Sequence, residues 1–311
     1  MKARSLKTTA AAALALLATA GLAGGASATT IGVTMDKFDD NFLTSVRNAI
    51  QAEAKDKGVT LQIEDAGDDT GKQISQIQNF IAQKVDAIIV NPVDTSATPK
   101  MTQLAVAAKI PLVYVNRKPE DKTLPSNVAF VGSNEKVSGT LEAEELAKCL
   151  KGKGNIVIME GQLSNNAALD RTADVEEVMA KHPDIKITQK QTAEWDRNKA
   201  IDLMNNWITQ GGKIDGVASN NDEMAIGAIL ALKQAGVDPK SVCIGGIDAT
   251  ADGLAEVANG NLYVTVFQNA KGQGKGAVDT ALALIKGEKV PSFVDVPFEK
   301  VTKDNYKQYA Q

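Results

Sequence analysis

Residues 218–228 read ASNNDEMAIGA, and this stretch sets the pattern for the rest of the chain. A short apolar run, residues 216–218, stops at five polar residues, 219–223, and good helix formers follow from Met224 to Gln234. This order is typical of a strand that ends at the N-terminus of a helix, with Asn221 or Asp222 as the N-cap. Ligands of open α/β sheets bind outside the carboxyl ends of the strands, so these polar side chains are expected to line a binding crevice.

The same strand-to-helix unit recurs along most of the chain. Continuous apolar runs such as residues 87–90 are typical of parallel strands that are covered on both faces. We expect strands at residues 30–35, 59–64, 87–90, 111–115, 128–131, 155–160, 185–191, 216–218, 242–247 and 262–267. Helices are expected at residues 42–57, 71–83, 97–109, 135–150, 166–181, 198–210, 224–234, 250–259 and 270–285. This alternation predicts an α/β fold with doubly wound, parallel, Rossmann-like sheets and right-handed crossovers.

About ten such units are too many for one small sheet, and the chain has 311 residues, a length typical of two domains. The pattern restarts near Gly132. The sequence therefore predicts two similar domains with a first boundary at residues 131–134.

The N-terminus has the three parts of a secretory signal peptide. Lys2, Arg4 and Lys7 precede an Ala/Leu-rich run, and residues 24–28 supply a small-residue cleavage site, so the mature chain is expected to begin near Thr29. The apolar run is too short for the alternative, a membrane anchor. Cleavage removes three basic residues and no acidic one, which lowers the net charge from −4 to −7. This charge makes nucleic acid and anionic membranes poor partners.

The chain has two cysteines, Cys149 and Cys243. An exported protein can form a disulfide, but spacing alone does not show whether two cysteines meet. We favour two buried free thiols, because free cysteine is commonly buried.

The sequence lacks the residues that several kinds of site would require. His182 is the one histidine and precedes a proline, which predicts a surface loop and leaves no multi-histidine metal site. There is no Gly-x-Ser-x-Gly elbow and no P-loop. We interpret the glycines at 272, 274 and 276 as close helix packing, since their spacing differs from a dinucleotide loop. The acidic residues near 36–40 lack the spacing of a helix-loop-helix calcium site, so no metal and no cofactor is expected.

What remains is a set of polar, charged and aromatic residues at expected strand ends. Carboxylate, amide and guanidinium groups match sugar hydroxyls, which both donate and accept, and aromatic faces stack on a ring. Each residue also has a purely structural interpretation, as a helix cap, a surface ion pair or part of the core. The candidate ligand-binding residues are Asp40, Phe42, Asn116, Arg117, Arg171, Trp195, Asn221, Asp248 and Gln268.

Taken together, six motifs resemble the periplasmic sugar-binding proteins of the ribose/galactose-type class, over nearly all of the mature sequence. They are residues 91–94 (NPVD), 116–117 (NR), 195–197 (WDR), 221–225 (NDEMA), 246–248 (GID) and Gln268. The resemblance implies two domains joined by a three-crossing hinge, which close over a ligand in the cleft between them. It places residues 29–132 and 269–296 in the N-terminal domain, and residues 133–268 and 297–311 in the C-terminal domain. It also carries the nine candidate residues over as ligand contacts.

Departures from the ribose-type pattern bear on the ligand. Asn116 stands where that pattern has Asp, Leu43 where it has a second aromatic, and Leu169 where it has an Arg. Residues 40–42 (DNF), 115–117 (VNR) and 165–168 (NNAA) are similar to the inositol- and rhizopine-binding branch.

The resemblance implies a monomeric periplasmic solute-binding component of an ABC importer, favouring a myo-inositol type of cyclitol. Its partners would be the membrane permease and, in some cases, a chemoreceptor. Three alternatives remain: a pentose- or hexose-binding protein of the same class, an exported sugar-acting enzyme, and a transcription regulator of this fold. The last would need a DNA-binding helix-turn-helix where this chain has a signal peptide.

Overall fold

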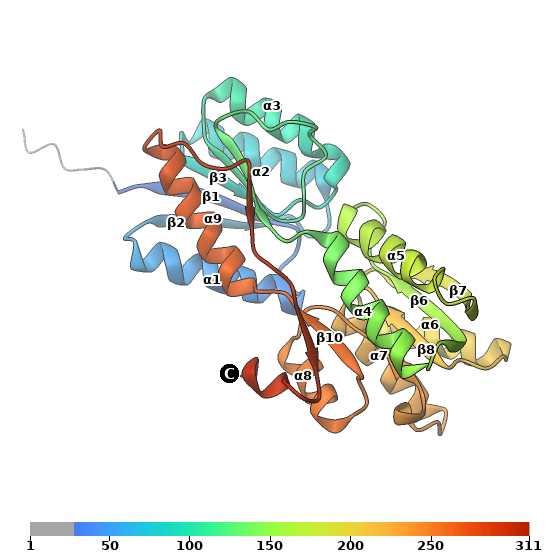
Figure 1. Ribbon diagram of the computed structural model, residues 1–311. Helices are drawn as coiled ribbons and strands as arrows, with labels where there is room; N and C mark the ends of the chain where they lie inside the picture. Colours follow the sequence, from blue (N-terminus) through green and yellow to red (C-terminus); the bar gives the residue numbers. More distant parts are fainter. Residues whose placement is uncertain (1–27, 311) are drawn as a thin grey trace, which may run out of the picture.

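The computed structural model describes residues 28–310, so the expected signal peptide lies outside the described residues. Figure 1 shows two lobes joined by connecting segments, with the C-terminus beside the second lobe. The first lobe contains β1–β5, β11, α1–α3 and α9, and the second contains β6–β10, β12 and α4–α8.

The first lobe is built on a six-stranded parallel sheet in the order β11-β5-β4-β3-β1-β2. Its strands are β1 (Thr30–Met35), β2 (Thr60–Asp65), β3 (Ala87–Val90), β4 (Leu112–Asn116), β5 (Val128–Gly132) and β11 (Phe293–Asp295). Its helices are α1 (Asn41–Asp56), α2 (Thr70–Ala82), α3 (Thr98–Ala108) and α9 (Ala270–Ile285).

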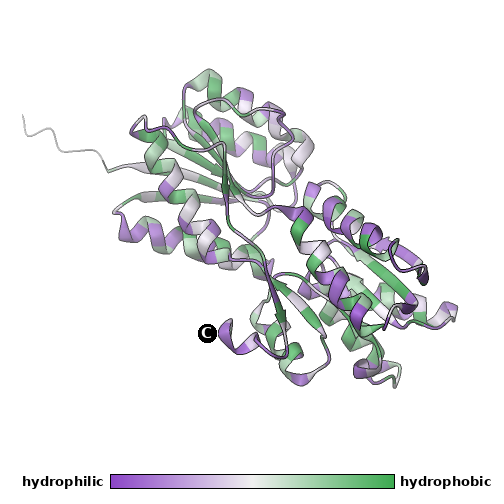
Figure 2. Ribbon diagram, in the orientation of Figure 1, coloured by the Kyte–Doolittle hydropathy of each residue, from purple (hydrophilic) through white to green (hydrophobic). Residues whose placement is uncertain are grey.

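The apolar run of β3 shows why this sheet has helices on both faces. Ala87 and Ile89 pack into the core under α1 and α9, whereas Ile88 and Val90 pack into the core under α2 and α3. Successive side chains of a strand point to opposite faces, so a continuous apolar strand needs both faces covered. Figure 2 shows the apolar residues concentrated in the strands and the polar ones on the outer faces of the helices.

The second lobe has a four-stranded parallel sheet, β7-β6-β8-β9, and an antiparallel pair, β10-β12. The strands are β6 (Lys153–Glu160), β7 (Asp184–Thr192), β8 (Gly216–Ser219), β9 (Cys243–Ile244), β10 (Val264–Phe267) and β12 (Glu299–Thr302). The helices are α4 (Glu135–Cys149), α5 (Asn166–Met179), α6 (Arg197–Gln210), α7 (Asp222–Gln234) and α8 (Ala251–Asn259). Isolated bridges from Gly245 to Val264 and from Asp248 to Phe267 connect the two sheets in parallel.

The chain passes between the lobes three times. The crossings lie between β5 and α4, between β10 and α9, and between β11 and β12. The predicted fold class, two doubly wound parallel sheets with alternating helices, is confirmed. The residue limits given above for the two domains stay a prediction.

The structure differs from the expected elements near the C-terminus and in one strand. Strands β11 and β12 and the short 3-10 helix Tyr306–Gln308 were not predicted. Of the strand expected at residues 242–247, only β9 is present. The residues that follow β9 pair with β10 through the two isolated bridges. The glycine interpretation holds at Gly274, where a Cβ would overlap Val46 and Ala49 of α1.

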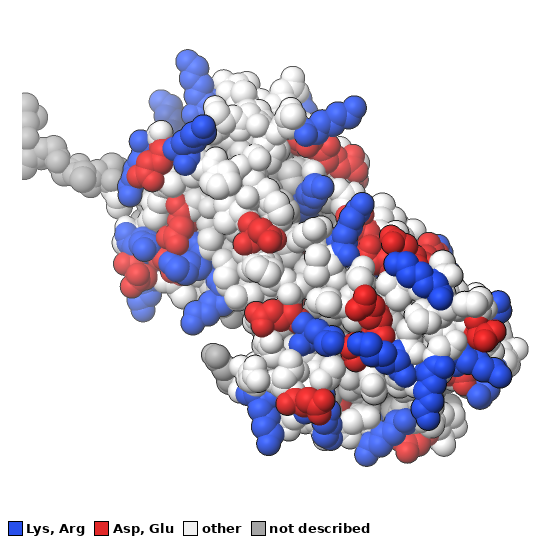
Figure 3. All heavy atoms as spheres, viewed as in Figure 1, with Lys and Arg blue, Asp and Glu red and all other residues white. Residues whose placement is uncertain are grey.

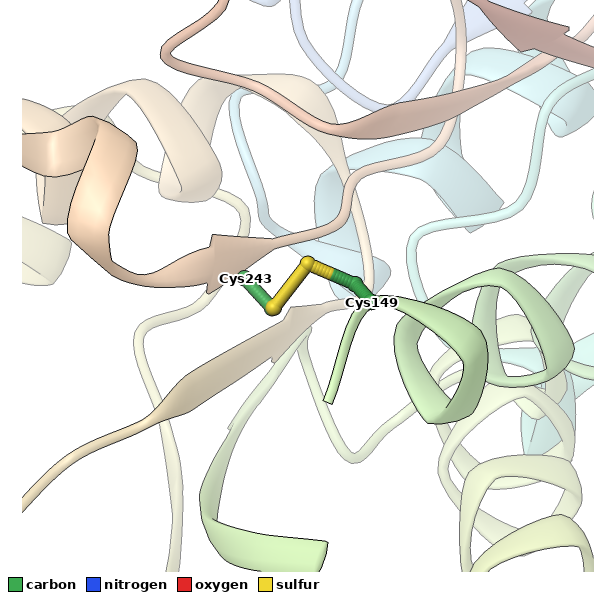
Figure 4. The surroundings of a disulfide bond; sticks show 2 residues. All are labelled: Cys149 and Cys243. Atoms are coloured by element: carbon green, nitrogen blue, oxygen red, sulfur yellow. A yellow bond between two sulfur atoms is a disulfide. The ribbon is translucent and has the colours of Figure 1, made fainter. Parts of the chain in front are cut away.

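The cysteine interpretation was wrong. Cys149 and Cys243 form a disulfide, with Cα atoms 5.9 Å apart, and it joins the end of α4 to β9 (Figure 4). Residues 94 positions apart in sequence meet because α4 packs beside β9 in the second lobe.

Among the described residues, no helix combines the length and apolar character needed to cross a bilayer. Figure 3 shows acidic and basic side chains interspersed over the visible face.

Candidate ligand-binding site

One pocket lies between the lobes and brings all nine candidate residues together. The pocket is small: the space between its walls, including the part open to solvent, is about 350 Å³. Its lining consists of the nine predicted residues, Asp40, Phe42, Asn116, Arg117, Arg171, Trp195, Asn221, Asp248 and Gln268, together with Leu43 and Ala167.

The strand ends explain why these residues meet. Asn116 and Arg117 end β4, and Asp40 and Phe42 stand at the N-terminus of α1, which follows β1. In the second lobe the contributions come from α5 and from the segments after β7, β8, β9 and β10. Leu169, in contrast, is exposed on α5 and does not line the pocket.

In the first lobe, Arg117 is fixed by buried acceptors. Its Nη2 lies 3.0 Å from Oδ2 of Asp36, which is fully buried, and its Nη1 donates to the carbonyl of Pro92 at 2.8 Å. Burial outweighs the attraction of Arg117 and raises the pKa of Asp36 to about 6. Sequence reasoning considered Asp36 only as a calcium ligand, although its position after β1 carries the same strand-end signal as the other site residues.

Asn116 is held in a left-handed backbone conformation, with φ of 68°, which asparagine tolerates better than most residues. Its Nδ2 donates to Oε1 of Gln273 at 3.2 Å, and its Oδ1 accepts from Nδ2 of Asn91 at 3.4 Å. An aspartate at this position would lose the donor to Gln273, so the amide fits its surroundings.

In the second lobe, Arg171 is the centre of a buried network. Its Nε donates to Oε2 of Glu135 at 2.8 Å and its Nη1 to the carbonyl of Asn220 at 2.7 Å. Its Nη2 donates to Oε1 of Gln268 at 3.4 Å, which leaves Nε2 of Gln268 buried without a partner among the described residues. Glu135 was expected only as the start of a helix.

Trp195 presents an aromatic face and an unused donor. Its Nε1 is buried without a partner in the described part of the chain, and Arg171 lies over the ring at 5.6 Å from its centroid. The ring rests against the backbone at Gly161, where a Cβ would overlap the indole.

We expect Gly161→Ala to move Trp195 and to lower ligand affinity about tenfold or more. Overpacking of this kind also costs about 1 to 3 kcal/mol of stability. Titration with ligand and urea unfolding measure the two effects. In a Trp195→Ala background the methyl group has room, so the same substitution should cost little there, and equal costs in both backgrounds would contradict the contact.

The stretch from Asn221 to Glu223 corrects one detail of the sequence analysis. Asn221 is the N-cap of α7, because its Oδ1 accepts from the Met224 N–H at 2.9 Å, and it also lines the pocket. Asp222 does not cap the helix. Its buried carboxylate accepts from Thr265 at 2.6 Å and from the Thr250 N–H at 2.8 Å, and so joins α7 to the segments beside β10 and α8.

Asp248 is held in an unusual backbone conformation with φ of 125°. Its N–H donates to the carbonyl of Val266 at 2.8 Å, within the bridge to β10. Such backbone strain persists only where the surroundings enforce it and is common at binding sites. Its side chain accepts no hydrogen bond from the described residues, and burial raises the pKa of Asp248 well above its usual range. Burial also raises the pKa of Asp40.

A further buried acid makes stability depend on pH. Glu142 is fully buried, its Oε1 accepts from the Ser219 N–H at 2.8 Å, and burial raises its pKa to about 8. The folded state therefore binds this proton more tightly than the unfolded state does. The stabilisation is complete below the unfolded pKa of 4.5 and is lost as the pH rises to about 8.

We expect Glu142→Gln to flatten this pH dependence. A shift of one pKa unit corresponds to about 1.4 kcal/mol. Between pH 5 and pH 8.5, the free energy of unfolding should therefore fall by roughly 3 to 5 kcal/mol more in wild type than in the variant. Urea unfolding at both pH values measures the difference. Some slope should remain, because burial also raises the pKa of Asp222 to about 7. Equal slopes in the two proteins would contradict the prediction.

Contacts across the cleft close the lobes over the pocket. Nδ2 of Asn41 donates to Oε1 of Glu223 at 2.7 Å, and Nε2 of Gln162 donates to Oδ1 of Asp68 at 2.8 Å. The Thr95 N–H donates to the carbonyl of Ser164 at 3.0 Å. The structure is therefore a closed form.

The pocket offers donors and acceptors around a small volume, with aromatic rings from Phe42 and Trp195. Acceptor oxygens of Asp40 and Asp248 and donors of Gln268 and Trp195 have capacity left for a ligand. Within residues 28–310, no group of three or more His, Cys, Asp or Glu side chains is arranged to hold a metal ion. His182 lies in the turn after α5 and does not line the pocket.

Sequence comparisons agree with this geometry. A family model described as "Periplasmic binding protein domain" matches residues 31–289. The chain is 56% identical over 288 residues to a Rhizobium meliloti protein named "Putative rhizopine-binding protein", covering 91% of this chain and 93% of that one. It is 38% identical to the "Xylitol-binding protein" of Mycolicibacterium smegmatis, covering 88% of this chain and 77% of that one.

Two solved structures are similar throughout. One is an ABC transporter solute-binding protein from Bacillus halodurans C-125 with bound myo-inositol, with TM-score 0.87 and 40% identity over 92% of this chain and 99% of that one. The other is a Caulobacter myo-inositol binding protein bound to myo-inositol, with TM-score 0.86 and 27% identity over 91% of this chain and 96% of that one.

Proposed function

The chain belongs to the periplasmic binding proteins of the ribose/galactose type, a non-catalytic family, and we propose that its ligand is a cyclitol of the myo-inositol type. It is a sugar- or polyol-binding protein of an ABC transporter. One observation above all supports a small hydroxylated ring as the ligand: nine polar and aromatic residues from both lobes line a single small pocket.

The lining suits a hydroxylated ring. Asp40, Asn116 and Arg117 would hold it from the first lobe, and Arg171, Asn221 and Asp248 from the second, while Phe42 and Trp195 cover its apolar faces. Gln268 would bind it at a crossing between the lobes. The amide of Asn116 and the apolar Leu43 support the cyclitol, since both depart from the ribose-type pattern, and the relatives named for rhizopine and solved with myo-inositol support it further.

Ligand binding would act through hinge closure. A ligand that contacts both lobes is bound better by the closed form, so it shifts the equilibrium from open to closed. The closed monomer would then be recognised by the membrane permease and, in some cases, by a chemoreceptor. The signal peptide would direct export and be removed near Ala28, and N-terminal sequencing of the mature protein tests this cleavage.

A pentose or hexose ligand is the second candidate. Similar solved structures carry D-allose and L-arabinofuranose, at 31% identity each. Isothermal calorimetry with myo-inositol, D-ribose, D-galactose, D-allose and L-arabinose decides between them. We expect myo-inositol to bind with a Kd of about 1 μM or lower, equivalent to about −8 kcal/mol. The cyclitol assignment would be overturned if myo-inositol gave no binding heat and a pentose gave the binding heat that we expect from myo-inositol.

A further inference from the structure

Both guanidinium groups of the pocket are already paired with carboxylates that lie behind its wall. Asp36 is fully buried and sits 3.0 Å from Arg117, and Glu135 is 5% exposed and sits 2.8 Å from Arg171. Neither carboxylate lines the pocket. The pocket therefore faces two neutral pairs that keep their N–H donors but not their net positive charge.

The carboxylates that do line the pocket have no such partner. Asp40 and Asp248 form no ion pair with any lysine or arginine of the described residues, and Asp40 uses one oxygen to cap α1. Two further cations outside the lining are also paired with carboxylates, Lys37 with Asp68 and Arg197 with Glu223. The pocket lining therefore contains no cationic side chain that lacks a carboxylate partner.

We propose that Asp36 and Glu135 are specificity-determining residues that restrict the pocket to ring ligands without a negative charge. They do so by neutralising Arg117 and Arg171, which would otherwise bind a carboxylate or phosphate in bidentate fashion. An anionic ring such as a uronate would then be buried beside Asp40 and Asp248 with no free cation to offset its charge. The inference rests on the proposed function and extends it to charge selectivity.

The test compares one neutral and one anionic ring in the same calorimeter. The probes are myo-inositol and D-glucuronate, titrated into wild type, Asp36→Asn and Glu135→Gln. Asparagine and glutamine keep the shape of the side chain but release the charge of the neighbouring arginine. The matched control is Asp39→Asn, which removes the same charge from an exposed residue close to the pocket.

Wild type and Asp39→Asn should favour myo-inositol over D-glucuronate by at least 100-fold. In Asp36→Asn or Glu135→Gln that ratio should fall at least tenfold, with D-glucuronate binding tighter in absolute terms. If Asp36→Asn does not fold, judged by its circular dichroism and melting, Glu135→Gln carries the test from the other lobe.

Two results would overturn the inference: tight D-glucuronate binding by wild type, or folded variants whose affinity for D-glucuronate equals that of wild type. Failure of the proposed function has a different signature. Wild type would then give no heat with myo-inositol, while the gain of D-glucuronate binding in the variants would still be measured against wild type.

Discussion

Asp248→Ala is expected to weaken ligand binding about 100- to 1000-fold while the protein stays folded. The Asp248 carboxylate faces the pocket, accepts no hydrogen bond from the described protein and is therefore free to accept two from a vicinal diol. Hydrogen bonds to charged groups contribute about 1.5 to 3 kcal/mol each, and two of them account for a loss of this size. Calorimetry with the ligand identified for wild type measures the change.

Asp248→Asn is the control for this prediction. Asparagine keeps the size of the side chain and one acceptor, so a loss of about tenfold is expected. If Asp248→Ala bound the ligand with unchanged affinity, Asp248 would not be a ligand contact. The assigned orientation of the second lobe toward the ligand would then also be wrong.

Fold prediction succeeded where the signal was local. A few adjacent residues are enough to predict the apolar strand β3 and the capped start of α7, and the structure has both elements at the expected positions. Strands β11 and β12 were missed because they are three and four residues long and mostly exposed. Their pairing partners, β5 and β10, lie far away in sequence, so no local periodicity marks them.

The nine candidate residues line one pocket, and their role as ligand contacts stays a prediction, whereas the buried residues that hold them in place were missed. In each lobe the carboxyl ends of the parallel strands meet at one edge of the sheet. The two edges face each other across the pocket, which brings Asn116 of the first lobe and Asp248 of the second together. The sequence left Asn221 and Asp222 as alternative N-caps of α7; Asn221 is the cap, and the contacts of Asp222 with Thr265 and Thr250 were not foreseen. Glu135 pairs with Arg171 across 36 residues, and only the packing of α4 on α5 brings them together.

The disulfide, like the pair of Glu135 with Arg171, forms through a tertiary contact that local sequence does not predict. Cys149 and Cys243 carry no pairing information in their spacing, and their separation depends on how the end of α4 meets β9. A bridge between residues this far apart restricts the unfolded chain strongly, because the stabilisation grows with the size of the closed loop. Its effect should fall on the second lobe, since both cysteines lie there.

Replacing both cysteines, as Cys149→Ser with Cys243→Ser, should therefore lower the free energy of unfolding by about 4 kcal/mol. The corresponding fall in Tm is roughly 10 °C. Urea unfolding of the oxidised proteins measures the loss, and amide hydrogen exchange should place it in α4–α8 rather than in the first lobe. Adding a thiol reductant to wild type should reproduce the loss, while the double variant should not respond to it. If oxidised wild type and the double variant unfold at the same urea concentration, the loop of 94 residues contributes nothing and the entropic argument fails here.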